Sequence, residues 1–199
     1  MKKELFKNKY RIASARAQWW DYRNSAPYFV TGCTRNRKHF FGFIENGEMH
    51  LNDLGKYAWD CWYEIPDHFP FVELINFVVM PNHIHGLLYL HNDFVLPNGV
   101  IVETLHATSL PPQPPQPPPQ QKNQQMAIIS PKQGSLSTVI RSYKSAVTKY
   151  ANNNNLPAGW QSRFHDHIVR NAEEYQRIFD YITNNPKNWK SDKFSKNDI

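Results

Sequence analysis

The first half of the chain is rich in residues that favour β-strands, and turn residues divide it into separate segments. Asn46-Gly47 is the strongest signal, because this dipeptide between two short apolar segments is typical of a β-hairpin with a two-residue turn. Pro81-Asn82 separates two further segments in the same way. We therefore predict strands over residues 28–34, 43–45, 48–51, 72–80 and 85–90.

Apolar residues follow a helical period in three other segments. One begins at Asn52 or Asp53 and is expected to end at Pro66. A second covers residues 135–151, and a third begins at Asn171 with Glu174 in the capping-box position and ends at Asn185-Pro186. A short strand is predicted over residues 164–170. Helices and antiparallel strands thus mix along one chain, which indicates a layered α+β fold.

Composition narrows the classes of protein that the chain can represent. The 199 residues have a net charge of +6 and 14% aromatic residues, a balance that favours a nucleic-acid partner. Cys33 and Cys61 are the only cysteines and have no CxxC spacing, which excludes a disulfide scaffold and a thiolate zinc site. No apolar run approaches the roughly 20 residues of a bilayer span. We expect a cytoplasmic, nucleoid-associated protein without a membrane partner.

One segment differs in composition from the rest of the chain. Residues 105–133 contain a run of eleven residues, 111–121, made only of proline and glutamine. Proline cannot donate to a β-ladder and glutamine has little to bury, so this segment is predicted to be a disordered insert within a single domain over 1–199. A docking site for a proline-recognition module is the alternative interpretation.

The strongest candidate for chemistry is the sequence Met80-Pro81-Asn82-His83-Ile84-His85-Gly86. On a strand, residues i and i+2 project from the same face, so His83 and His85 are predicted to lie side by side. Two neighbouring imidazoles can bind a divalent metal ion. The spacing alone is equally compatible with two ordinary polar residues at the end of a sheet.

The last predicted helix adds a second candidate. Tyr181 lies roughly 110° around the helix from the centre of the apolar stripe, so its hydroxyl can reach a cleft while its ring stays packed. Asn185 is four residues further along, on nearly the same face. A tyrosine at the edge of an amphipathic helix is also common without any catalytic role.

Several motifs, taken in order, resemble the REP-associated tyrosine transposases, which carry a His-hydrophobe-His motif and a single nucleophilic tyrosine. They occupy residues 28–37, 46–49, 78–86, 142–147, 160–161 and 180–186. The resemblance extends from about Tyr10 to Trp189 and is interrupted only by the Pro/Gln insert. Either chemical motif alone would be a weak signal, whereas several in the expected order are specific.

The resemblance implies a fold, a reaction and a set of site residues. The fold would be a ferredoxin-like (RRM-like) antiparallel sheet with helices on one face, of the HUH (His-hydrophobe-His) endonuclease type. His83 and His85 would bind Mg²⁺ or Mn²⁺, with Asn185 as the third ligand. Tyr181 would attack hairpin-forming single-stranded DNA, such as a palindromic repeat, and form a 5′-phosphotyrosine intermediate. The working unit would be a monomer or a homodimer.

Basic residues mark a candidate path for the DNA backbone. They gather after the first strand, on the helix that follows the insert, and around the short strand near residue 165. The candidates are Arg35, Arg37, Lys38, Arg141, Lys144, Arg163 and Arg170. Each of them could equally be an ordinary solvated charge.

Two other functions remain compatible with the same residues. A catalytically silent nucleic-acid-binding module could use the same RRM-like sheet without cleaving its ligand. A metal hydrolase could use the histidine pair with water as the nucleophile. We prefer the interpretation that the protein is a transposase, acting as a single-strand DNA endonuclease and strand transferase. This interpretation accounts for His83, His85 and Tyr181 together.

Overall fold

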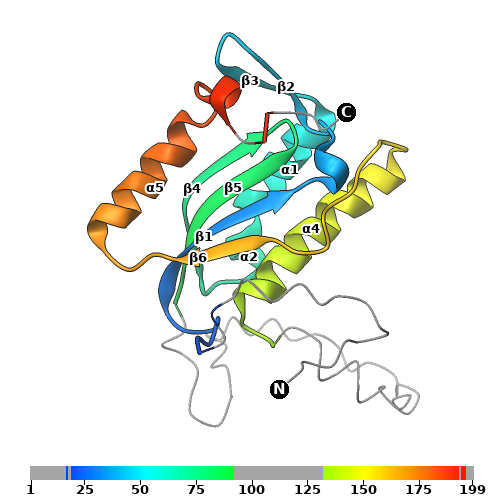
Figure 1. Ribbon diagram of the computed structural model, residues 1–199. Helices are drawn as coiled ribbons and strands as arrows, with labels where there is room; N and C mark the ends of the chain where they lie inside the picture. Colours follow the sequence, from blue (N-terminus) through cyan, green and yellow to red (C-terminus); the bar gives the residue numbers. More distant parts are fainter. Residues whose placement is uncertain (1–16, 18, 92–131, 193, 196–199) are drawn as a thin grey trace, which may run out of the picture.

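A four-stranded antiparallel sheet, with the strand order β4-β5-β1-β6, forms the centre of the molecule (Figure 1). The computed structural model describes residues 17, 19–91, 132–192, 194 and 195. The strands of the sheet are β1 (Ala26–Cys33), β4 (Val72–Met80), β5 (His83–Leu90) and β6 (His165–Ile168). The two middle strands, β5 and β1, are paired with each other over their whole length.

Helices cover both faces of this sheet. α1 (Asp53–Tyr63), the short α2 (Ile65–His68) and α4 (Leu136–Asn153) lie behind it in Figure 1, whereas α5 (Ala172–Asn184) packs against β4 and β5 from the other side. The chain order β1-α1-β4-β5-α4-β6 is that of the ferredoxin-like fold. The expected α+β, ferredoxin-like class is therefore confirmed, but the expectation of helices on one face was wrong, because α5 covers the face opposite to α1 and α4.

The β2–β3 hairpin is an addition between β1 and α1 and forms a separate two-stranded sheet. Its strands are β2 (Gly42–Glu45) and β3 (Glu48–Leu51). Asn46 and Gly47 have φ angles of 51° and 81°, as a type I′ turn requires, so the hairpin predicted from this dipeptide is confirmed. Gly47 lies beside Lys187, so the tip of the hairpin contacts the segment that follows α5.

Helices α1 and α5 begin at the capping residues that the sequence indicated. The side chain of Asn52 accepts a hydrogen bond from Gly55 N at 2.9 Å, and that of Asn171 accepts one from Glu174 N at 2.8 Å. The expected end of the first helix at Pro66 was wrong in detail. α1 already ends at Tyr63, and Pro66 lies in the first turn of α2, where the missing N–H costs no hydrogen bond.

Alternation along β5 divides its side chains between two cores. Ile84 and Leu88 face α1 and α4, together with Tyr28 and Val30 of β1. Leu87 faces α5 and packs with residues of β4 and of that helix, among them Val78, Met80, Ile178 and Ile182. His83 and His85 have the same parity as Leu87, so both imidazoles project onto the α5 face.

Gly86 is the one position of β5 where a side chain has no room, because the Trp62 indole of α1 lies directly on it. A Cβ at residue 86 would come within 2.2 Å of Trp62 Cζ2. We expect Gly86→Ala to lower the free energy of unfolding by about 1–3 kcal/mol, the usual cost of overpacking a core. Urea unfolding of this variant and of the wild type measures the difference. An unfolding free energy equal to that of the wild type would contradict this packing.

Most of the Pro/Gln-rich insert over 105–133 lies outside the described residues, since the chain is not described from 92 to 131. None of the helices in the described ranges is long and apolar enough to cross a lipid bilayer.

Candidate metal and tyrosine site

The two histidines lie at the start of β5, directly after the Pro81-Asn82 turn. Their side chains are almost completely buried, with exposed fractions of 0% for His83 and 1% for His85. The ring centroids are 4.5 Å apart. The predicted side-by-side placement is thus confirmed, and the rings face the space between the sheet and the segment that follows α5.

Each imidazole is held through Nδ1 by a neighbouring side chain. His83 Nδ1 lies 2.8 Å from Asn82 Oδ1, and His85 Nδ1 lies 2.8 Å from Thr31 Oγ1 of β1. The Phe29 ring also stacks on the His85 ring, with centroids 5.3 Å apart. These contacts orient both rings and direct both Nε2 atoms toward the same side.

Tyr181 meets the histidine pair from α5. Its hydroxyl oxygen lies 3.1 Å from His85 Nε2, and its side chain is 39% exposed. Burial, followed by the nearby Asp192 carboxylate, raises the pKa of Tyr181, although a hydrogen bond from Asn185 acts in the opposite direction. The phenol is therefore protonated at neutral pH and still open to solvent on one side.

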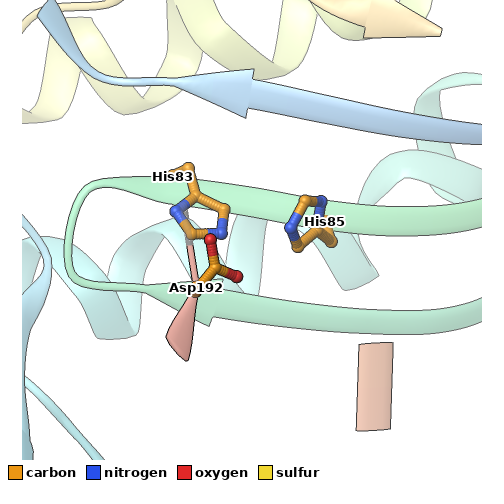
Figure 2. A group of neighbouring side chains, drawn as sticks. All are labelled: His83, His85 and Asp192. Carbon is orange, nitrogen blue, oxygen red and sulfur yellow. The ribbon is translucent and has the colours of Figure 1, made fainter. Parts of the chain in front are cut away.

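A carboxylate that the sequence reasoning missed completes the cluster. Asp192 follows a 3₁₀ turn over Trp189–Ser191, and one ligand atom from each of His83, His85 and Asp192 lies within 4.8 Å of the others. Figure 2 shows the carboxylate against the His83 ring, with the His85 ring beside it. Asp192 lies beyond the residues that carry the resemblance, and no local pattern marks it.

Asn185, the expected third ligand, lies in the same place. It is 1% exposed, and its Nδ2 donates to Asp192 Oδ2 at 3.3 Å. Its Oδ1 is buried and has no hydrogen-bond partner among the described residues. A buried amide oxygen without a partner is costly, and a bound cation would satisfy it.

The donor set fits a divalent metal ion. Two imidazole nitrogens and a carboxylate oxygen lie within 4.8 Å of one another, and the amide of Asn185 contacts that carboxylate. Together these nitrogen and oxygen donors suit Mn²⁺ or Mg²⁺ better than a metal that prefers thiolate ligands. Trp189 stacks on His83 with centroids 6.1 Å apart, and Phe194 lies 4.5 Å from the same ring. These aromatic rings shield one side of the cluster from water.

The basic residues proposed from the sequence divide into two groups. The loop with Arg35, Arg37 and Lys38 lies near the site, because the Arg37 guanidinium is 5.2 Å from the centre of the Phe194 ring that contacts His83. Arg141 and Lys144 belong to α4, on the opposite face of the sheet.

The Lys144 side chain is held by main-chain carbonyls of the segment between α4 and β6. Its ammonium donates to the carbonyl of Gln161 at 2.6 Å and lies 3.5 Å from that of Arg163. Burial lowers the pKa of Lys144 to about 8. The side chain of Arg163 is exposed, as is that of Arg170, whose main-chain N–H donates to Glu174. Of these basic residues, Arg37 is the one whose side chain lies over the ring that packs against His83.

Comparison with known proteins gives a sequence relative and several similar structures. An uncharacterized protein of Haemophilus influenzae is 34% identical over 180 residues, which cover 90% of each chain. The structure of a REP-associated tyrosine transposase bound to a REP hairpin has a TM-score of 0.50 and 19% identity, and the match covers 86% of this chain and 73% of that one. No family model matches the sequence. At this level of identity, the structural likeness concerns the fold.

Proposed function

We propose that this chain, which belongs to the same family as the uncharacterized Haemophilus influenzae protein, is a metal-dependent transposase that cleaves and rejoins single-stranded DNA through Tyr181. The observation that carries the proposal is the contact between the Tyr181 hydroxyl and His85 Nε2 at 3.1 Å. A nucleophile thus lies directly against a cluster of metal-binding groups. Few other functions require a half-exposed phenol in that position.

The metal would be held by His83, His85 and Asp192, with Asn185 Oδ1 as a further donor. Imidazole ligands favour Mn²⁺ over Mg²⁺ in affinity, whereas the oxygen donors suit either ion. A bound divalent cation would polarise the scissile phosphate and screen its negative charge from an attacking oxygen.

Tyr181 would supply that oxygen. It forms a bond to phosphorus, the bond between phosphorus and the 3′ oxygen breaks, and the 5′ phosphate remains on the protein. The phenol loses one proton and the departing 3′ oxygen gains one, so the step is balanced without another reactant. Because the phosphodiester is exchanged for a phosphotyrosine, attack by the free 3′-OH rejoins the strand without ATP.

The raised pKa of Tyr181 limits how this step can begin. Burial and the Asp192 carboxylate both disfavour the phenolate, so the phenol has to pass its proton to an acceptor when it attacks. The 3.1 Å contact at His85 Nε2 places the hydroxyl next to the atom that would bind the metal, and the packing of the Tyr181 ring edge-on to Phe29, at 6.1 Å, limits the rotation of that ring. Both contacts reduce the entropy cost of reaching an in-line geometry.

The DNA substrate would be a hairpin with an unpaired flank. The relative of known structure is bound to a REP hairpin. Arg35, Arg37 and Lys38 would contact DNA phosphates beside the proposed site, and we extend the same role to Arg163 and Arg170. Arg141 and Lys144 would contact only DNA that passes around the edge of the sheet.

A cleavage assay with end-labelled hairpin DNA tests the proposed function. The substrates are single-stranded oligonucleotides copied from palindromic repeats beside the coding region, incubated with the protein and Mn²⁺. Denaturing electrophoresis should show a slowly migrating band that contains the 5′ phosphate side of the cut and is sensitive to protease.

Two other results would contradict the proposal in different ways. A cut product without a covalent adduct would indicate a metal hydrolase that uses water. Binding of the hairpin without any cut in the presence of Mn²⁺ or Mg²⁺ would indicate a nucleic-acid-binding module.

A further inference from the structure

We propose, on the basis of the metal centre proposed above, that Asn82 is a positioning residue. It would hold His83 in the tautomer that binds metal and connect the strand that carries both histidines to the segment that carries Asp192. Asn82 lies in the turn between β4 and β5 and is 1% exposed.

The orientation of the Asn82 amide follows from its partners. Its Nδ2 lies 3.1 Å from the carbonyl oxygen of Arg37 and 2.8 Å from that of Phe194. A carbonyl can only accept a hydrogen bond, so the atom that faces both of them must be the NH₂ group. The remaining atom, Oδ1, is therefore the one that faces His83.

This orientation determines where His83 carries its proton. Asn82 Oδ1 lies 2.8 Å from His83 Nδ1 and can only accept, so Nδ1 must be the protonated ring nitrogen. In the neutral ring the lone pair is then on Nε2. A histidine that binds metal through one nitrogen usually donates its other N–H to an oxygen, and Asn82 supplies that oxygen here.

Thr31 does not impose the same choice on His85. Its hydroxyl can donate or accept, so the 2.8 Å contact with His85 Nδ1 is compatible with either tautomer. Asn82 is thus the side chain that selects a tautomer within the pair.

Asn82 also closes a ring of contacts around the proposed metal centre. Phe194, whose carbonyl accepts from Asn82 Nδ2, donates its main-chain N–H to Asp192 Oδ1 at 2.7 Å. The same side chain therefore connects a ligand on β5 to the segment that carries the carboxylate. Without Asn82, the separation between His83 and Asp192 would depend on the aromatic packing and on the contact between Asn185 and Asp192.

The test combines the affinity for Mn²⁺ alone with the tautomer of His83. Calorimetry should show that Asn82→Ala binds Mn²⁺ about 10–100-fold more weakly than the wild type, the usual effect of removing the hydrogen-bond partner of a ligating histidine. Asn76→Ala is the matched control. The Asn76 side chain, like that of Asn82, connects distant segments, because it joins β4 to Phe179 and Thr183 of α5, but it contacts no proposed ligand. Its affinity should stay within twofold of the wild type.

Nitrogen-15 spectra of the metal-free protein supply a readout that a merely structural role would not change. The wild type should show His83 protonated at Nδ1, and Asn82→Ala should show a mixture of tautomers. Asn82→Asp keeps an acceptor for His83 Nδ1, so it should keep the tautomer while losing the donation to Phe194.

The outcomes separate this inference from the proposed function. If the wild type binds Mn²⁺ and Asn82→Ala binds it equally well, the positioning role is overturned while the metal centre stands. His83 protonated at Nε2 in the wild type would also overturn it, even if Asn82→Ala fails to fold. Absence of Mn²⁺ binding by the wild type would overturn the metal centre, and the inference with it.

Discussion

Tyr181→Phe is expected to abolish the covalent protein–DNA adduct while the affinity for hairpin DNA stays within about twofold of the wild type. Loss of a sole nucleophile reduces turnover by roughly 10⁴-fold or more, which places the adduct below detection on a denaturing gel. The ring is retained, so its packing against Phe29 and His85 survives, and the contacts of the hydroxyl with His85 Nε2 at 3.1 Å, with Asn185 and with Asp192 are lost. Thermal unfolding should therefore change little.

Tyr175→Phe is the matched control for this variant. Tyr175 lies on the same helix and packs against the core on the α5 face, but no contact places it at the histidine pair. It should form the adduct at the wild-type rate. A shifted band that persists in Tyr181→Phe would exclude Tyr181 as the nucleophile and direct the search to the other tyrosines.

His83→Ala is expected to remove Mn²⁺-dependent cleavage while hairpin binding remains. A metal ion contributes several kcal/mol of charge stabilisation in the transition state, so the cleavage rate should fall on the order of 10³-fold. His83 is fully buried and faces the proposed metal centre rather than the loop with Arg35 and Lys38, which explains why binding should persist. Single-turnover cleavage and filter binding of the same labelled hairpin measure the two effects.

His91→Ala is the control, since His91 follows the same strand but pairs with Glu73 at its far end. Asp192→Asn tests the carboxylate separately by removing its charge with little change of shape. It should weaken Mn²⁺ binding if Asp192 is a ligand and leave it unchanged if Asn185 alone completes the set. Equal loss of cleavage and DNA binding in His83→Ala would mean that the histidine pair is structural.

Local patterns in the sequence were sufficient for much of the fold. The Asn46-Gly47 turn, the capping roles of Asn52 and Asn171 and the bounds of β4 all depend on residues close together in the chain. The shared face of His83 and His85 follows from the two-residue period of a strand in the same way.

The composition of the site depended on contacts between distant parts of the chain. Tyr181 and His85 are 96 residues apart, and Asn82 and Phe194 are 112 apart. The pairing of β1 with β5 placed Thr31 against His85, and the turn after α5 brought Asp192 to the histidines. No local pattern encodes these approaches, because they result from strand register and helix packing.

The basic residues illustrate the same division. Sequence alone determined that the chain carries excess positive charge and that its clusters follow the first strand and the insert. Only the tertiary structure decided that the loop with Arg37 lies beside the site, whereas the Lys144 ammonium donates to the main-chain carbonyl of Gln161. The net charge depends only on composition. Where each charged side chain points depends on which face of its helix or loop packs against the core.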